Sequence, residues 1–225
     1  MANAEVKRFW KSVSVENGTI LLDGRLVKTP GRLTMQLPTP QLAEAIADEW
    51  RAVEGAIKPH EMKLTGLANA AIERAPPAET LVVYGETDLL CYRAETPPEL
   101  AAREAEVWDP LLDWGRQRYD IAFTVTSGIV HAAQPAETIR RLSTAVSAYN
   151  DFQRTALSPL VTIGGSLVVA LMLAEGAITP DAAFDACHLD ELWQADLWGE
   201  DWMATDARDA RRADFLSAAR FLSLL

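Results

Sequence analysis

The chain of 225 residues is 49% hydrophobic and 24% charged, a globular composition that is long enough for one large domain or two small ones. Its net charge of −11 is uneven, because residues 1–60 hold 8 basic and 7 acidic side chains while residues 61–225 hold 13 and 25. This acidity argues against binding to nucleic acid or to an anionic membrane surface, since both need cations that face phosphates.

The first forty residues alternate apolar and polar side chains between tight-turn signals, which predicts a small antiparallel β meander. Asn17-Gly18 and Asp23-Gly24 separate the first three apolar runs, and Pro30-Gly31 precedes the fourth. The expected strands cover residues 9–15, 19–22, 25–28 and 32–37. A meander of this size cannot bury its apolar face alone, so we expect it to pack on helices.

From Pro40 onward the apolar residues recur with helical periodicity. The expected helices cover residues 41–53, 65–74, 78–91, 98–107, 110–119, 135–156, 159–175, 180–198 and 206–224, and a short extended piece at 122–125 could return to the sheet. Asp109-Pro110, Ser158-Pro159 and Thr179-Pro180 have the pattern of a cap followed by a first-turn proline. Gly176 and Gly199 lie where helix-ending glycines belong.

The predicted fold class is α+β, with a small N-terminal antiparallel β meander packed on a larger C-terminal all-helical region. The change from strands to helices near residues 55–65 is the only boundary that the sequence indicates. We therefore expect residues 1–60 to form a β-rich region with one helix and residues 61–225 to form a helical region. The boundary could equally be a change of layer within one compact body.

Signals for membranes and secretion are absent from the sequence. No apolar run reaches the roughly 20 residues that cross a bilayer, and the longest, Leu167 to Ala174, is typical of a buried helix. The N-terminus has neither a signal-peptide core nor an amphipathic presequence. Cys91 and Cys187 fit no ligand spacing, which favours two buried free thiols in a reducing compartment. We expect a cytoplasmic protein without membrane insertion.

Motifs for catalysis are also missing. The stretch Gly18 to Arg25 has neither the spacing nor the lysine of a phosphate-binding loop, and it lies in a predicted hairpin. The histidines His60, His131 and His188 do not pair at metal-ligand spacing, and there is no Gly-x-Ser-x-Gly elbow. No catalytic residue, cofactor or metal is predicted. A small-molecule enzyme of unknown reaction and a structural scaffold remain the alternatives to a protein-binding function.

Residues 190–202 read DELWQADLWGEDW and hold three of the seven tryptophans with five acids. In a helix of about 100° per residue, one face holds Leu189, Leu192, Trp193 and Leu197. The opposite face holds Glu191, Gln194, Ala195 and Trp198. If the first face is core, the second presents a tryptophan beside a carboxylate, which is typical of a protein contact surface. Solvated acids, with Trp198 covering a neighbouring helix, would give the same pattern.

Several short motifs gain meaning as an ordered series. They are Arg8-Phe9-Trp10, Leu26-Val27-Lys28-Thr29-Pro30, Ala47-Asp48-Glu49-Trp50, Leu64-Thr65-Gly66-Leu67-Ala68-Asn69, Cys91-Tyr92-Arg93, Trp108-Asp109-Pro110 and Leu189-Asp190-Glu191. From about residue 8 to about residue 220, the series resembles the family of assembly chaperones that attend the α subunit of the catalytic head of ATP synthase, F1-ATPase.

The resemblance implies a molecular chaperone that binds the unassembled α subunit and shields its β-facing surface until the β subunit arrives. It implies no cofactor and no catalytic activity, and a β-rich N-terminal region followed by helices. The family is mitochondrial with alphaproteobacterial relatives, and the missing presequence favours a bacterial, cytoplasmic member, which we expect to be a monomer.

The resemblance also implies roles for single residues. A functionally critical glutamate of the family aligns with Glu191, and a required tryptophan aligns with Trp50. The predicted partner-binding residues are Glu191, Asp190, Gln194 and Trp198. The predicted structurally critical residues are Trp50, Trp108, Asp109 and Arg93. Trp50 continues an apolar stripe with Leu42 and Ile46, so we expect it to pack its helix on the sheet. After Gly199 the chain departs from the family, because Met203-Ala204 stands where relatives often carry a histidine.

Overall fold

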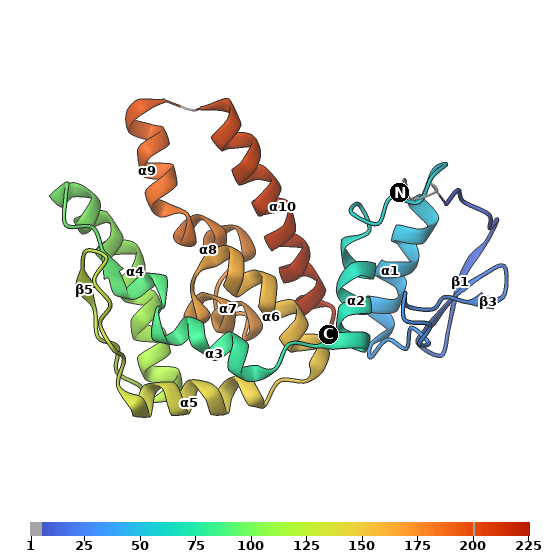
Figure 1. Ribbon diagram of the computed structural model, residues 1–225, viewed down its shortest axis with the longest axis horizontal. Helices are drawn as coiled ribbons and strands as arrows, with labels where there is room; N and C mark the ends of the chain where they lie inside the picture. The colour runs from blue at the N-terminus through green and yellow to red at the C-terminus, as the bar shows by residue number, and fades with distance from the viewer. Residues whose placement is uncertain (1–5, 200) are drawn as a thin grey trace.

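A computed structural model describes residues 6–199 and 201–225 of the chain. Figure 1 shows a β-rich N-terminal part at one end of the long axis and a helical body at the other. The C-terminus returns to the junction between these two parts (Figure 1). The α+β class and the order of a small antiparallel sheet followed by helices are confirmed.

The N-terminal sheet is an antiparallel meander of β1 (Val13–Glu16), β2 (Thr19–Leu22) and β3 (Arg25–Leu26), in that order. Asn17 and Gly18 have φ values of 50° and 75°, so the two turn residues adopt the left-handed conformation that a tight hairpin needs. The Asn-Gly signal thus fixes the register in which Glu16 pairs with Thr19.

The fourth predicted strand, residues 32–37, is wrong. This segment makes only an isolated bridge, in which Thr34 pairs with Lys28. Arg32 has a φ of 68°, and the amide of Gln36 donates to the oxygen of Thr34 at 2.9 Å. The left-handed conformation at Arg32 turns the chain, and the local bond uses the Gln36 amide that a strand would need for pairing. The segment therefore runs beside the sheet without forming a strand.

Helix α1 (Pro40–Ala52) packs on β1 and β2 and completes a first hydrophobic core. It begins at Thr39, whose hydroxyl accepts from the amide of Leu42 at 3.2 Å. Leu42 and Ile46 are fully buried, as the apolar stripe predicts. Trp50 is partly buried and meets the ring of Trp10 edge to face, with centroids 5.2 Å apart. The contacts of Trp50 therefore suit the structural role predicted for it, which stays a prediction.

The helical body begins with α2 (Lys63–Arg74), α3 (Ala78–Glu86), a 3-10 turn η1 (Leu89–Cys91) and the short strand β4 (Tyr92–Arg93). It continues with α4 (Pro98–Tyr119), β5 (Thr126–Ser127), α5 (Ala136–Ser147) and α6 (Asp151–Gly164). It ends with α7 (Leu167–Ala174), α8 (Pro180–Cys187), α9 (Leu189–Trp198) and α10 (Trp202–Ser223). The predicted extended piece at 122–125 forms no strand, and β5, which follows it, pairs in parallel with β4 as a separate sheet rather than with the meander.

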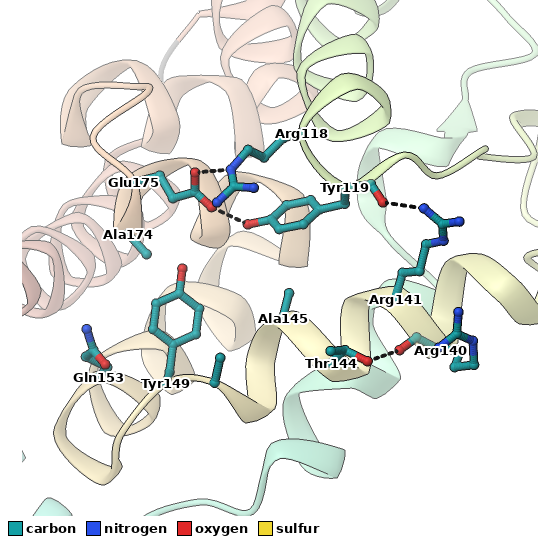
Figure 2. A pocket seen from close by; sticks show the side chains of 11 residues that line it. Arg118, Tyr119, Arg140, Arg141, Thr144, Ala145, Tyr149, Gln153, Ala174 and Glu175 are labelled. Atoms are coloured by element: carbon teal, nitrogen blue, oxygen red, sulfur yellow. Dashed lines mark hydrogen bonds and ion pairs between the residues drawn. The ribbon is translucent and has the colours of Figure 1, made fainter.

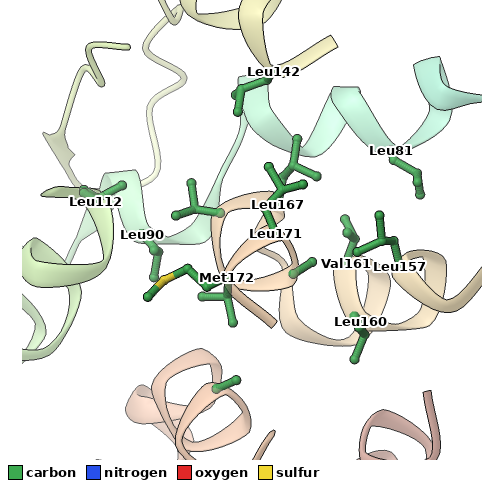
Figure 3. Close-up of a cluster of buried hydrophobic side chains, with 14 of the residues drawn as sticks. Leu81, Leu90, Leu112, Leu142, Leu157, Leu160, Val161, Leu167, Leu171 and Met172 are labelled. Atoms are coloured by element: carbon green, nitrogen blue, oxygen red, sulfur yellow. The ribbon is translucent and has the colours of Figure 1, made fainter. Parts of the chain in front are cut away.

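Helix α7 lies at the centre of the second core, as its unbroken apolar sequence predicts. The first six residues, Leu167 to Met172, are all buried. Figure 3 shows leucines of the surrounding helices gathered around it, with Leu81, Leu142 and Leu157 coming from α3, α5 and α6. A helix that is apolar on every side must be enclosed by other elements, and this one is.

Several helix boundaries differ from the prediction, and two predicted helix starts, at Pro110 and Pro159, lie inside longer helices. Residues 98–107 and 110–119 form one helix, α4, with Pro110 inside it. Asp109 also lies inside this helix and so caps no new one, and its carboxylate accepts from Arg93 at 2.7 Å. Pro159 likewise lies inside α6, which begins instead at Asn150 with a capping box that includes Gln153. The predicted helices 135–156 and 159–175 are therefore three, α5, α6 and α7.

The cap predictions farther along the chain are confirmed. Thr179 caps α8 by accepting from the amide of Ala182, and Pro180 occupies the first turn. Gly176 and Gly199 have φ values of 67° and 87° and follow α7 and α9. Where one helix was expected over residues 180–198, the chain breaks at His188 between α8 and α9.

The two cores adjoin through α10, which packs against α6 and α2. Phe221 of α10 is fully buried in the first core and stacks on Phe152 of α6, with ring centroids 6.3 Å apart. The hydroxyl of Thr39 donates to the oxygen of Leu224 at 2.5 Å, which ties the C-terminus to the start of α1. The division at residue 60 stays a prediction, and α2 contributes to the first core.

Asp88 joins two elements of the helical body through a fully buried carboxylate. One oxygen accepts from the amide of Leu90 at 3.1 Å, and the other accepts from the amide of Val168 at 3.0 Å. Burial raises the pKa of Asp88 to about 6, although these hydrogen bonds oppose the rise. Because the folded pKa lies above the unfolded value, the stability that Asp88 contributes is present below about pH 4 and is lost as the pH rises through about 6.

We predict that Asp88→Asn removes this pH dependence. The free energy of unfolding of the variant, relative to the parent chain, should improve by up to about 3 kcal/mol between pH 4 and pH 7. Urea unfolding of both proteins at the two pH values measures the difference. If the difference in unfolding free energy between the two proteins is the same at both pH values, the raised pKa of Asp88 is contradicted.

Candidate partner-binding site

Helices α9 and α10 form an antiparallel hairpin that rises from the helical body (Figure 1). Gly199 ends α9, and Asp201 begins α10 by accepting from the amide of Met203 at 2.9 Å. Leu189 at the base of α9 and Phe215 on α10 are buried in the second core. The hairpin therefore has a fixed base and projects its far end away from the body.

A groove of about 410 Å³ runs between the two arms of the hairpin. Glu191, Gln194 and Trp198 line it from α9, and Arg211 is among the residues that line it from α10. Three of the four predicted partner-binding residues thus share one groove. The helical phasing of the sequence brings them to this face, as expected.

The groove contains an ion pair between its arms. One guanidinium nitrogen of Arg211 donates to both carboxylate oxygens of Glu191, at 2.6 and 2.9 Å. The side chain of Arg211 is 41% exposed and that of Glu191 is 49% exposed. A pair this exposed stabilises a fold by about 0–1 kcal/mol, so Glu191 can leave Arg211 for another partner at little cost.

The far end of the hairpin exposes four large apolar side chains, which we call the hairpin tip. They are Leu197, Trp198, Trp202 and Met203, with exposed fractions of 55%, 79%, 72% and 63%. The expectation that Leu197 lies in the core is wrong, because the body covers only the first turns of α9. Exposed apolar side chains that gather at one end of a hairpin mark a surface that another protein covers.

Asp190 lies on a different side of α9 from Glu191. It is partly buried, does not line the hairpin groove, and its carboxyl group meets Glu104 of α4. Glu104 is almost fully buried and accepts from the amide of Ala94 at 2.7 Å. Burial, and then the neighbouring Asp190 carboxylate, raise the pKa of Glu104 above its ordinary value. Asp190 thus joins α9 to α4, and its predicted role in partner binding stays a prediction.

The structure brings three of the predicted structurally critical residues together beside α4. Trp108 is 1% exposed, and its indole nitrogen donates to the oxygen of Ala186 at 2.8 Å. The guanidinium of Arg93 lies over the Trp108 ring, 5.2 Å from its centroid, and donates to Asp109. These contacts link β4, α4 and the end of α8, from which α9 departs.

Residues 6–199 and 201–225 present neither a metal-binding cluster nor a membrane-spanning helix. Within these residues, no three His, Cys, Asp or Glu side chains gather where they could hold a metal ion. None of the described helices combines the length and the apolar sequence that a membrane crossing needs. Cys91 is buried and Cys187 partly buried, and both are free thiols, as predicted.

Exposed apolar side chains at the end of an anchored hairpin mark this chain as a protein that binds another protein. Residues 7–116 match the family model described as ATP12 chaperone protein. The crystal structure of Atp12 from Paracoccus denitrificans is 40% identical to this chain, with a TM-score of 0.91 over 97% of each chain. The Atu1473 protein of Agrobacterium tumefaciens is 36% identical, with a TM-score of 0.91 over 97% of this chain and 85% of the other.

A point mutant of the Paracoccus protein gives the same TM-score of 0.91, with 39% identity and the same 97% coverage of both chains. The chain belongs to the ATP12 chaperone family, and its role is that of a chaperone in the assembly of ATP synthase. The resemblance seen in the ordered series of sequence motifs is thereby confirmed.

Proposed function

We propose that this chain binds the unassembled α subunit of F1-ATPase and shields its β-facing surface until the β subunit arrives. The observation that carries this proposal is the hairpin tip, whose four apolar side chains stand exposed at the end of an anchored arm. A free subunit exposes the apolar interface that its partner normally covers, and such patches aggregate. The hairpin tip supplies apolar contact area for a patch of this kind.

The groove next to the hairpin tip supports a transient contact rather than a permanent one. Glu191, Arg211 and Gln194 form a polar rim beside Trp198, which is the usual arrangement of an interface with an apolar centre. Charges at the rim reject wrong partners and set the register of binding. An interface of moderate size and mixed polarity can yield its client when a tighter partner arrives. We also propose that the chain acts as a monomer in the bacterial cytoplasm, without a cofactor and without catalytic activity.

Capture of separately purified F1 subunits tests the proposal. The immobilised chain should retain the α subunit and not the β subunit, and it should suppress the aggregation of α on dilution from denaturant. Added β subunit should then release α. Retention of β alone, or of neither subunit, would overturn the proposal and would leave the enzyme or scaffold alternatives.

We predict that Trp198→Ala weakens capture of the α subunit about thirtyfold, equivalent to about 2 kcal/mol, because exposed tryptophans dominate many protein interfaces. The thermal unfolding midpoint should barely change, since the side chain is 79% exposed. Phe9→Ala is the matched control, because Phe9 is 68% exposed and belongs to the N-terminal part, which lies at the other end of the molecule from the helical body (Figure 1). Binding titrations that fall equally for both variants would contradict a specific role of the hairpin tip.

A further inference from the structure

A second surface feature lies on the opposite side of the helical body, where the ends of α4 and α7 face α5 and the start of α6 (Figure 2). It is an open groove of about 970 Å³, which we call the basic groove. Its charged and aromatic lining residues are Arg118, Tyr119, Arg140, Arg141, Tyr149 and Glu175. Three arginines and one glutamate therefore face this groove, on a chain whose net charge is −11.

Acids outside the basic groove hold two of these arginines in place. Glu137 accepts from Arg140 at 2.6 and 2.8 Å and from Arg141 at 2.7 Å, and Asp120 accepts from Arg141 at 2.5 Å. Neither acid lines the groove. Hydrogen bonds from Arg140 and then Arg141 lower the pKa of Glu137 to about 2, so Glu137 is ionised at every physiological pH. The guanidinium groups are thus positioned before any ligand arrives, which lowers the entropy cost of binding.

The basic groove already holds one carboxylate of this chain. Glu175 accepts from Nε of Arg118 at 2.5 Å and from the hydroxyl of Tyr119 at 2.7 Å, as the dashed lines of Figure 2 show. Burial, and then Glu175 itself, raise the pKa of Tyr119 well above its ordinary value, so the phenol remains a donor. The two terminal nitrogens of Arg118 and Nη1 of Arg140 donate to none of the described residues. Three guanidinium nitrogens, two of Arg118 and one of Arg140, can therefore donate to the oxygens of a ligand.

The shape and floor of the basic groove suit an extended chain. Along α5, the stretch from Arg140 to Ala148 measures roughly 12 Å, which is about the length of four extended residues. Ala145, Ala148 and Ala174 also line the groove, and their small side chains leave room for a peptide backbone. No glycine lines the groove, and a phosphate cradle built from glycine-rich backbone amides is therefore not its chemistry.

We propose that the basic groove binds an acidic, extended segment of a partner protein, with carboxylates on Arg118 and Arg140. The two terminal nitrogens of Arg118 can hold a carboxylate with two parallel hydrogen bonds, and Nη1 of Arg140 can donate to a second one. The rings of Tyr119 and Tyr149 add apolar contact. Glu137, Asp120 and Glu175 pair with the arginines of the groove and offset part of their positive charge, whereas acids more than about 10 Å away are screened at 0.1 M salt. This surface is separate from the hairpin, and its occupancy does not depend on the function proposed for the hairpin tip.

Fluorescence anisotropy with a short labelled peptide of glutamates and one tyrosine tests this proposal on the full chain. We expect binding that weakens with salt, and no comparable binding of the matched peptide in which glutamine replaces glutamate. Arg118→Gln with Arg140→Gln should weaken binding by about tenfold or more. Arg25→Gln with Arg103→Gln is the matched control, because both arginines lie outside the basic groove. Trp198→Ala should bind the peptide normally, which separates this test from that of the hairpin tip.

If the double variant does not fold, Arg140→Gln alone serves, since its side chain is 66% exposed and pairs only with Glu137 among the described residues. A smaller loss that the Arg103→Gln single variant does not show would still support the proposal. Equal weakening in the control, or equal affinity for the glutamate and glutamine peptides, would overturn it. Tighter binding of inorganic phosphate than of the acidic peptide would also overturn it, because the occupant would then be a small phosphate ligand.

Discussion

Replacing Glu191 with lysine should abolish the suppression of α-subunit aggregation and leave the fold intact. The ion pair with Arg211 is about half exposed, so its loss should cost no more than about 1 kcal/mol and shift the thermal midpoint by no more than about 4 °C. The new lysine would face Arg211 within the hairpin groove and would present the opposite charge to the client. Light scattering of diluted α subunit and a circular dichroism melt measure the two effects.

A charge swap separates a contact with the client from a contact between the two arms of the hairpin. Glu191→Lys combined with Arg211→Glu restores an ion pair between α9 and α10 with the two charges exchanged. If Glu191 meets the client, the swapped protein should remain inactive. Recovery of activity in the swap would mean that Glu191 acts by holding α10. Asp196→Lys is the matched control, because Asp196 lies on the same helix but faces the side toward α4.

Replacing Trp108 with alanine should destabilise the chain by about 3–5 kcal/mol and lower the thermal midpoint by roughly 6–20 °C. The side chain is 1% exposed, fills the second core and donates to the oxygen of Ala186 at 2.8 Å. Ala186 lies in the last turn of α8, directly before α9, so the bond also positions the base of the hairpin. The suppression of α-subunit aggregation should therefore fall together with the thermal midpoint. Glu191→Lys, in contrast, should lower only the suppression of aggregation.

Two further variants make the Trp108 prediction specific. Trp108→Phe keeps most of the apolar volume but leaves the buried oxygen of Ala186 without its donor, so a loss of about 1–3 kcal/mol is expected. Trp202→Ala removes the same side chain from a site that is 72% exposed and should leave the melt nearly unchanged. A melt that Trp108→Ala does not lower would contradict the structural role of this residue.

Local signals in the sequence predicted the elements that depend on local chemistry. Asn17-Gly18 gave the first hairpin its turn, the run from Leu167 gave a buried helix, and Thr179-Pro180 began α8. The same rules wrongly predicted that helices begin at Pro110 and Pro159, which lie inside α4 and α6. Tertiary packing around α4 and α6 outweighs the lost backbone hydrogen bond of a mid-helix proline, and such packing is not visible in a local pattern.

The residues of the candidate site were likewise predicted only where local helical spacing determines their position. Helical phasing placed Glu191, Gln194 and Trp198 on one face, and the structure confirms that they line one groove. Arg211 was missed, because it lies twenty residues from Glu191 and no spacing rule links two arms of a hairpin. Leu197 was assigned to the core because a helical pattern does not reveal where the covering helix ends.

Hydrogen–deuterium exchange of the chain with and without purified α subunit tests the central claim most directly. We predict that the client slows exchange in the last turns of α9 and the first turns of α10, which carry the hairpin tip, and leaves exchange in the N-terminal meander unchanged. Protection confined to the meander, or a complex that leaves exchange throughout the hairpin unchanged, would contradict the proposal that the hairpin tip binds the α subunit.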